Sequence, residues 1–523
     1  MKAAITLPPM KRRWKILVVL AAALAVACLI GVVRHYQLRW ATEAYIAQLK
    51  AQGEPMDLAQ VLPPPVPPEQ NSADTMRRAA ALMKSNQEWW GTNSVGPMGM
   101  VAPGKAKVAW WQPDVRSSLS TNSWLEVGSV LAEDKESLSL LHQIFNKPNL
   151  DFQINYKAGF VDFSITNLTL MESKRASQLL SGATIYDLHS GDAASAVENI
   201  RTALAIIQAL RQERYVITEL VRMAMANIMV SANWELLQAT NLSEQQLSDL
   251  QTGWANLDFI QSGVNALEME RASGQVTTAK WRRSNEDLIS SVYLTPKARA
   301  NLGMEPLTAW DKVKIKPRII LWRYWWSYPD ELRQIKGSQV LIDTMRAAQT
   351  NGSFEEAIEN QSKSLDELGI TGLDDEFPSL FGGDPNFHSM LSEGITSLSG
   401  VARRMMAAET AKRTMITAIA LKRYQLKHGN YPPDLKVLVP EFLTAVPLDP
   451  VDGQPLRYRL NSDGTFLLYS IGPNGKDDGG NPQLEQDIEG SNFYWLGPHA
   501  LDWVWPQPAT AEEIEEFYAH PPK

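Results

Sequence analysis

The sequence has almost no cysteine. Cys28 is the only one among 523 residues, and it lies inside a long apolar run. Disulfide bonds within the chain are therefore excluded, and the fold must be stabilised by packing or by a bound metal. A cysteine-free outer portion is compatible with an oxidising compartment but does not establish one.

The motifs of common catalytic centres are also missing. The chain contains no H-E-x-x-H, G-x-S-x-G or C-x-x-C motif, and its seven histidines are scattered singly. Residues 99–105 match the first part of a phosphate-binding loop, but Ala106 stands where a magnesium-binding serine or threonine is required. We therefore expect no catalytic activity. Paired carboxylates of the glycosidase kind stay open, because separation in space is not visible in a sequence.

An excess of positive charge is absent as well. The chain has 50 lysines and arginines against 58 acids, a net charge of −8, and no basic stripe. This balance excludes nucleic acid as a partner, because such binding depends on neutralising phosphates. A hydrophobic content of 44% is enough for packed cores, and the length predicts two or three domains.

The chain does have one long apolar run, which extends from residue 16 to residue 33. A helix of about this length spans a bilayer. Basic residues at positions 2, 11, 12, 13 and 15 precede the run, which predicts that the N-terminus stays in the cytoplasm. We expect a single-pass transmembrane helix in a bacterial inner membrane, with the lipid bilayer as a partner and the bulk of the chain extracytoplasmic. A cleaved signal peptide and a lipoprotein cleavage site at residues 25–28 are the alternatives.

The segment beyond the apolar run is mainly helical in pattern. Residues 35–52 continue the helix, and the proline-rich stretch 62–68 predicts a stiff spacer, with a partner-docking site as the alternative. Apolar periodicity predicts helices at 173–188, 192–211, 215–238 and from 243, where Ser243 and Gln246 have capping-box spacing. Short connections favour an antiparallel bundle over a repeat-like solenoid, whereas residues 72–170 have no single clear pattern.

Tryptophan is abundant, with 17 residues. Residues 318–328 read RIILWRYWWSY, and Trp322, Trp325 and Trp326 fall on neighbouring faces of a helix expected to continue to residue 336. Aromatics beside arginine suit a bilayer interface, a partner contact or a sugar platform. A place in the core is the other interpretation, and we favour it.

The stretch from residue 423 to residue 488 has the most specific pattern. A helix should end at Gly429, and alternation predicts two strands at 456–460 and 466–471 around an Asn-Ser-Asp-Gly turn. The motif elements, in order, are Gly429-x-Tyr431-Pro432, Pro447-x-Asp449-Pro450, Gly453-x-Pro455-x-x-Tyr458, and Ser470-x-Gly472-x-x-Gly475 followed by Gly479-Gly480 and Asp487-Ile488. Together they predict a helix packed on a small antiparallel sheet.

This order resembles the C-terminal globular domain of the major pseudopilins of type II secretion. The resemblance covers roughly residues 402–488, and it implies a link to a secretion or pilus-like envelope apparatus. Pseudopilins also carry a processing motif before their apolar helix, which leads directly into the globular domain. Here that motif is absent, and almost 370 residues separate the apolar run from the pseudopilin-like region. We therefore expect a membrane-anchored protein that contains such a domain rather than a filament subunit.

The resemblance also implies a calcium site. The family binds calcium in the loop after this sheet, and the positions that match are Asn474, Asp477, Asp478 and Asp487. Calcium takes six to eight oxygen ligands, which adjacent carboxylates and glycine-freed carbonyls can supply. Asn474 stands where the family usually has aspartate, and the loop has one extra residue before Gly479-Gly480. An acidic turn without a metal is the alternative.

The sequence thus predicts a mainly α protein with a transmembrane helix, a helical-bundle ectodomain and a small α+β pseudopilin-like domain. Its expected segments are a cytoplasmic tail (1–15), the membrane helix (16–33), a helix and spacer (34–71), the ectodomain (72–368), a linker (369–400), the pseudopilin-like domain (401–490) and a Trp/Pro-rich tail (491–523). The expected function is that of a non-catalytic scaffold. The alternative is a protein that binds or hydrolyses polysaccharide through its tryptophans.

Overall fold

The computed structural model describes residues 12–84, 98–116, 121–161, 164–293, 299, 305–370, 389–484, 495–497 and 499–520. The fold is mainly helical, as predicted. Its α-helices are α1 (Arg12–Ala51), α2 (Leu58–Val61), α3 (Ala73–Leu82), α5 (Trp124–Glu133), α6 (Lys135–Ile144), α7 (Ser164–His189), α8 (Ala193–Ala209), α9 (Val216–Leu237), α10 (Glu244–Ala255), α11 (Ile260–Arg283), α12 (Asn285–Tyr293), α14 (Ala309–Leu321), α15 (Ser327–Asn351), α16 (Glu355–Glu367), α17 (Glu393–Leu398), α18 (Val401–His428) and α19 (Ala511–Ala519).

Within the described residues, short strands form three small sheets. The strands are β1 (Met100–Ala102), β2 (Lys105–Ala106), β3 (Val115–Arg116), β4 (Thr121–Asn122), β5 (Arg457–Leu460), β6 (Phe466–Ser470), β7 (Trp503–Val504) and β8 (Gln507–Pro508). Antiparallel β5, β6 and β7 make one sheet, β3 and β4 a hairpin, and β1, β2 and β8 the third. In the third sheet β2 pairs with β8 in parallel, so the chain's last strand closes onto a segment some 400 residues earlier.

The bundle from α7 to α10 confirms the helices predicted between residues 173 and 257. α7 packs on α8 and α9, and the turn at Gly191, with φ of +80°, connects α7 to α8. Ser243 accepts from the Gln246 amide and the Gln246 side chain returns to the Ser243 amide, which confirms the capping box. One continuous core of buried side chains runs from α3 through the bundle to α18 and β6.

Two helical stretches are interrupted. Residues 124–144 form two helices, α5 and α6, which meet at Asp134, whose buried carboxylate accepts from the Lys84 amide at 2.6 Å. The helix expected over 318–336 contains a π-helical segment at residues 322–326, shortly after Pro317 in α14. Proline cannot donate to the helical ladder, and π-segments accommodate such local irregularity.

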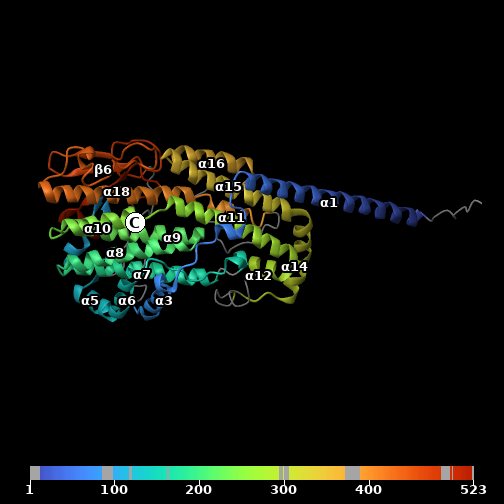
Figure 1. Cartoon of the computed structure of the whole chain (residues 1–523), viewed down its shortest axis with the longest axis horizontal. Helices are drawn as coiled ribbons and strands as arrows, with labels where there is room; N and C mark the ends of the chain where they lie inside the picture. The colour runs from blue at the N-terminus through green and yellow to red at the C-terminus, as the bar shows by residue number, and fades with distance from the viewer. Residues whose placement is uncertain are drawn as a thin grey trace, which may run out of the picture.

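α1 has two unlike halves. From about His35 onward it packs along α15, while its first half projects from the body (Figure 1). Among the residues that the structure describes, none of the helices has the length and apolarity that crossing a membrane demands. The transmembrane helix predicted at residues 16–33 is therefore not supported by the fold and stays a prediction.

The C-terminal module consists of α18, the β5–β6–β7 sheet and the loop after β6. α18 ends at Gly429, which has a left-handed φ of 83°, and β5 and β6 form the expected hairpin. The described part of residues 491–523 is folded into this region, because it supplies β7, β8 and α19. The module lies at the end of the body opposite the projecting half of α1 (Figure 1).

Candidate functional site

The acidic loop follows β6 and occupies residues 472–484. Gly472 has a φ of +71°, and a Cβ at this position would collide with the Leu501 carbonyl oxygen. Position 472 therefore requires glycine, because the chain leaving β6 passes directly against the residues that precede β7. This close approach brings the acids of the loop beside those of two other segments.

Arg457, on β5, is the centre of the charges in this region. Its guanidinium lies 3.1 Å from Asp449, 2.6 Å from Asp452 and 3.5 Å from Asp477. Asp449 is fully buried and also accepts from the amides of Val451 and Ile471 and from the Ser470 hydroxyl. One arginine thus supplies the positive charge that three carboxylates share.

Of the predicted ligands that the structure describes, Asp477 is the one that Arg457 contacts. Its Oδ1 accepts from the Tyr469 hydroxyl and the Gly479 amide, each at 3.0 Å. Burial raises the pKa of Asp477, but these hydrogen bonds and the nearby Arg457 outweigh it and hold the pKa below its ordinary value. Asp477 is therefore a charged group that already has its partners.

Asp502 is the acid that sequence reasoning missed. It is 1% exposed, and its carboxylate accepts from the backbone amides of Asp478 at 3.3 Å and of Gly480 and Asn481 at 2.8 Å. These bonds fix the second half of the acidic loop onto the start of β7. Asp502 belongs to the segment we expected to be a tail, where no spacing in the sequence connects it to residues 478–481.

The predicted calcium ligands are only partly brought together. Asn474 donates to Asp478 at 2.9 Å and accepts from the Lys476 amide, while Asp487 lies outside the described residues. Within the described ranges, no group of three or more His, Cys, Asp or Glu side chains could hold a metal ion. The described part of the loop satisfies its charges through Arg457 and backbone amides, and calcium binding stays a prediction of the resemblance.

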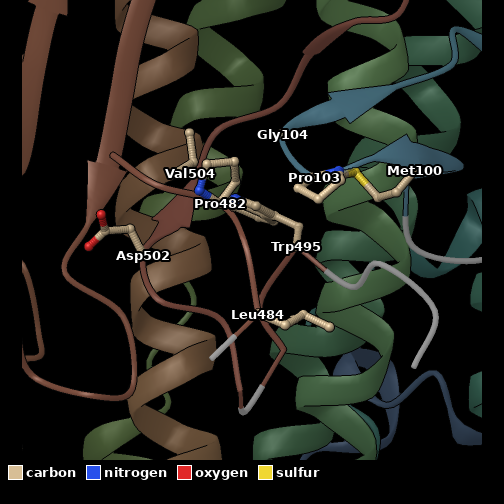
Figure 2. Close-up of a pocket in the computed structure, with 8 residues that line it drawn as sticks. All are labelled: Met100, Pro103, Gly104, Pro482, Leu484, Trp495, Asp502 and Val504. Carbon is tan, nitrogen blue, oxygen red and sulfur yellow. The ribbon is translucent and has the colours of Figure 1, made fainter. Parts of the chain in front are cut away.

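A small cavity lies beside this loop, between the β1–β2 turn and the segment leading into β7 (Figure 2). Gly104 and Pro482 lie in contact in its lining, and Trp495 and Asp502 are among the other lining residues. Its volume is about 10 Å³, which holds no more than one water molecule. This cavity cannot admit an organic substrate.

Three buried glutamates in the bundle have strongly raised pKa values. Burial raises the pKa of Glu213 to about 8, of Glu235 to about 8 and of Glu270 to about 7. Glu235 accepts from the Ala109 amide and Glu270 from the Val216 amide, whereas neither Glu213 oxygen has a hydrogen-bond partner. They are separate acids in the interior, none of which has another of the three among the groups that shift its pKa, rather than a convergent pair.

Most of the described tryptophans are either buried or exposed, and Trp110, Trp124 and Trp326 are half-buried. Trp234, Trp254, Trp322 and Trp503 are fully buried, and Trp281, Trp495 and Trp505 nearly so. The exposed ones are Trp14, Trp40, Trp111, Trp310 and Trp325, and four of these five lie on α1 or between residues 309 and 326. The core interpretation favoured for the 318–328 segment therefore fits Trp322, while Trp325 is 39% exposed.

Comparison of the chain with known protein families, curated proteins and solved structures finds no match. The similarity to pseudopilins therefore depends on the motif order alone. The strands and the Gly429 cap that those motifs predict are present. Family membership, and everything the resemblance implies about partners, is not established by these findings.

Proposed function

We propose that this protein is a non-catalytic scaffold, held at a bacterial inner membrane by residues 16–33 and carrying most of its chain on the extracytoplasmic side. The C-terminal module serves as its interaction surface, and its partners belong to a secretion or pilus-like apparatus. The partner class is inferred from the motif resemblance, and the scaffold role from the physical observations that follow.

The observation that carries the proposal is the surface of the projecting half of α1. Leu17, Val19, Leu20, Leu29 and Ile30 are each between 57% and 66% exposed there. Monomeric proteins in water rarely leave so many large apolar side chains uncovered in one contiguous surface. A lipid bilayer is the partner that fits an apolar helical run preceded by basic residues.

The other half of α1 is fixed to the body. Glu54, just beyond its end, pairs with Arg346 of α15 and, at 3.1 Å, with the fully buried Arg271 of α11. Thr42 donates to the Tyr328 carbonyl, and Leu49 is buried beside Ile335. Removing one partner from a buried pair is costly, so these contacts join the helix rigidly to the bundle.

The closed interior favours a scaffold over an enzyme or sugar binder. A polysaccharide site would need an open cleft lined by tryptophans. The tryptophans of the bundle and the module are buried, and the cavity in Figure 2 has room for no more than one water molecule. α18 packs against α9 and α10 along its length. The module is therefore built into the bundle, which does not suit a free filament subunit.

Crosslinked co-purification of the full-length protein from native membranes tests the proposal. We expect envelope proteins of a secretion or pilus-like assembly to be recovered. A variant with Lys436→Glu and Arg459→Glu, two exposed residues of the module, should reduce recovery, and the exposed Lys135→Glu change on α6 should not. Recovery of cell-wall glycan without such proteins would contradict the proposal and favour the polysaccharide alternative.

A further inference from the structure

α14 has two apolar faces. One face is buried: Ile315, Ile319 and Trp322, just after α14, pack with Trp281 and Leu288 in a cluster separate from the main core. The opposite face is uncovered. Its members recur at helical spacing and comprise Trp310 (65% exposed), Val313 (52%), Ile320 (54%), Leu321 (45%) and Tyr324 (57%). A helix that is already packed on one side has no need of a second apolar stripe for its own folding.

Basic side chains flank the uncovered stripe. Lys314 and Lys316 are exposed on either side of it. Arg318 is exposed on the same side as Lys314, one helical turn further along. The Lys314 ammonium lies 5.7 Å from the centre of the Trp310 ring. Lysine and arginine in such positions can keep their charge in water while their stems cover apolar surface.

The α14 segment, defined as residues 309–326, lies at the base of the projecting half of α1. A Cβ on Gly31 would come within 2.9 Å of Trp325 Cζ2, so the indole rests on the α1 backbone there. His35 Nδ1 is 2.8 Å from the Tyr324 carbonyl oxygen. Gly31 and His35 lie at the end of the apolar run, and α14 occupies the end of the body from which α1 projects (Figure 1).

We infer that the α14 segment is a second membrane contact, which lies in the headgroup region of an anionic bilayer. This inference rests on the proposed anchoring by α1. Tryptophan and tyrosine favour that region because one end of each ring system is apolar and the other polar. Lysines beside an apolar stripe add attraction to anionic lipids, and the contact with Gly31 and His35 places the stripe at the level where the anchor enters the bilayer.

The test uses the full-length protein in vesicles. In a Cys28→Ala background, Val313→Cys or Leu321→Cys carries an environment-sensitive fluorophore, and Leu125→Cys, an 84% exposed position on α5, is the matched control. With phosphatidylcholine and phosphatidylglycerol vesicles, labels at 313 and 321 should shift to the blue and be quenched by spin-labelled lipid. The label at 125 should do neither.

Charge reversal tests the lysines. Lys314→Glu with Lys316→Glu should weaken the membrane contact of the α14 segment, by about fivefold for each lysine removed and more for the reversal. Lys436→Glu with Arg459→Glu, at the far end of the body, should leave the labels at 313 and 321 unchanged. The effect should shrink in phosphatidylcholine alone and at high salt, because both remove the electrostatic attraction.

The possible failures are distinguishable. If the protein resists carbonate extraction while the labels at 313 and 321 stay in water, the α14 inference is overturned and anchoring by α1 stands. If carbonate releases the protein, anchoring itself fails. If the labels are protected in detergent in proportion to protein concentration, a second copy covers the stripe, and the lipid contact is overturned.

Discussion

The two ends of the molecule use tryptophan in opposite ways. In the C-terminal module, Trp495, Trp503 and Trp505 are all at most 7% exposed, and the indole of Trp503 donates to the Gly497 carbonyl within the fold. At the α1 end, Trp310 and Trp325 remain exposed beside an apolar helix. The same residue type completes a core at one end and leaves an apolar surface uncovered at the other.

The difference shows which end buries its aromatic side chains within the fold and which end leaves them exposed. The module gives the Trp503 indole, the Asp449 carboxylate and the Asp502 carboxylate partners within the fold, while the Trp495 indole nitrogen is buried without a hydrogen-bond partner. The α1 end has apolar surface without a covering element among the described residues. Substitutions of the buried groups of the module should therefore act on folding stability, whereas substitutions in the exposed apolar surface of the α1 end should act on attachment to the membrane.

The largest effect is expected from charge in the projecting half of α1. Leu20→Arg together with Leu29→Arg should move the protein from the carbonate-resistant membrane fraction to the soluble fraction, because each arginine costs about 3 kcal/mol near a bilayer centre. Fractionation and immunoblotting measure this. Leu125→Arg, at an even more exposed position on the body, should leave the protein in the membrane. Retention of the double variant would remove the proposed contrast between the ends.

A pair of tryptophan substitutions compares the ends directly. Trp503→Ala should lower the free energy of unfolding by about 3–5 kcal/mol, because it opens a cavity in a packed core. Trp310→Ala should change it by less than about 0.5 kcal/mol in detergent, because an exposed side chain has few contacts to lose. Urea unfolding monitored by circular dichroism provides both values, and equal losses would contradict the distinction.

Arg457 should be nearly as important to the module as its buried tryptophans. Arg457→Ala leaves Asp449 buried without its cation, which should cost about 3 kcal/mol of folding stability. Arg459→Ala, two residues along the same strand and exposed, is the matched control and should be nearly neutral. Adding Asp449→Asn to Arg457→Ala should recover part of the loss, since the stranded charge is then absent; no recovery would argue against the charge explanation.

A fourth substitution tests the bundle between the two ends, where a buried glutamate makes the stability depend on pH. Burial raises the pKa of Glu235 to about 8. Between the ordinary pKa of a glutamate and pH 8, the folded protein therefore keeps a proton on Glu235 that the unfolded chain releases. This part of the stability is full at low pH and declines as pH rises toward 8, by about 1.4 kcal/mol per pH unit. Glu235→Gln should remove its own share of the fall in urea midpoint between pH 5.5 and 7.5 and leave the shares of Glu213 and Glu270, whereas the exposed Glu133→Gln should leave the whole fall unchanged.

The smallest effect is expected from calcium. If the acidic loop binds the ion as the resemblance implies, calcium at roughly five times its Kd should stabilise the protein by about 1 kcal/mol relative to chelator. Asp478→Asn should abolish this shift in melting temperature, while Asp366→Asn, an exposed acid on α16, should preserve it. An identical melting temperature with calcium, magnesium and chelator would show that Arg457 and the backbone amides suffice.

The elements that the sequence predicted well are those specified by neighbouring residues. The helices between 173 and 257 follow from apolar spacing and short turns, and the β5–β6 hairpin from alternation around Asn-Ser-Asp-Gly. The missed features depend on distant pairs. β2 and β8 are two residues each, and Asp502 reaches the acidic loop only after the chain has folded. The alternation of apolar and polar residues over 456–460 places Arg457 on a strand, but it does not reveal that three carboxylates lie around its guanidinium.

The continuity of α1 has a mechanical consequence. The helix runs unbroken from Arg12 to Ala51, a length of about 60 Å, and the pairs of Glu54 with Arg346 and Arg271 join its far end to the bundle. Because α1 is one continuous helix joined to the bundle at its end, its projecting half and the body should move together. Any tilt imposed on its projecting half swings the C-terminal module through an arc at the opposite end of the body. If the module binds a partner as we propose, the tilt of α1 would set the height and the angle of that contact.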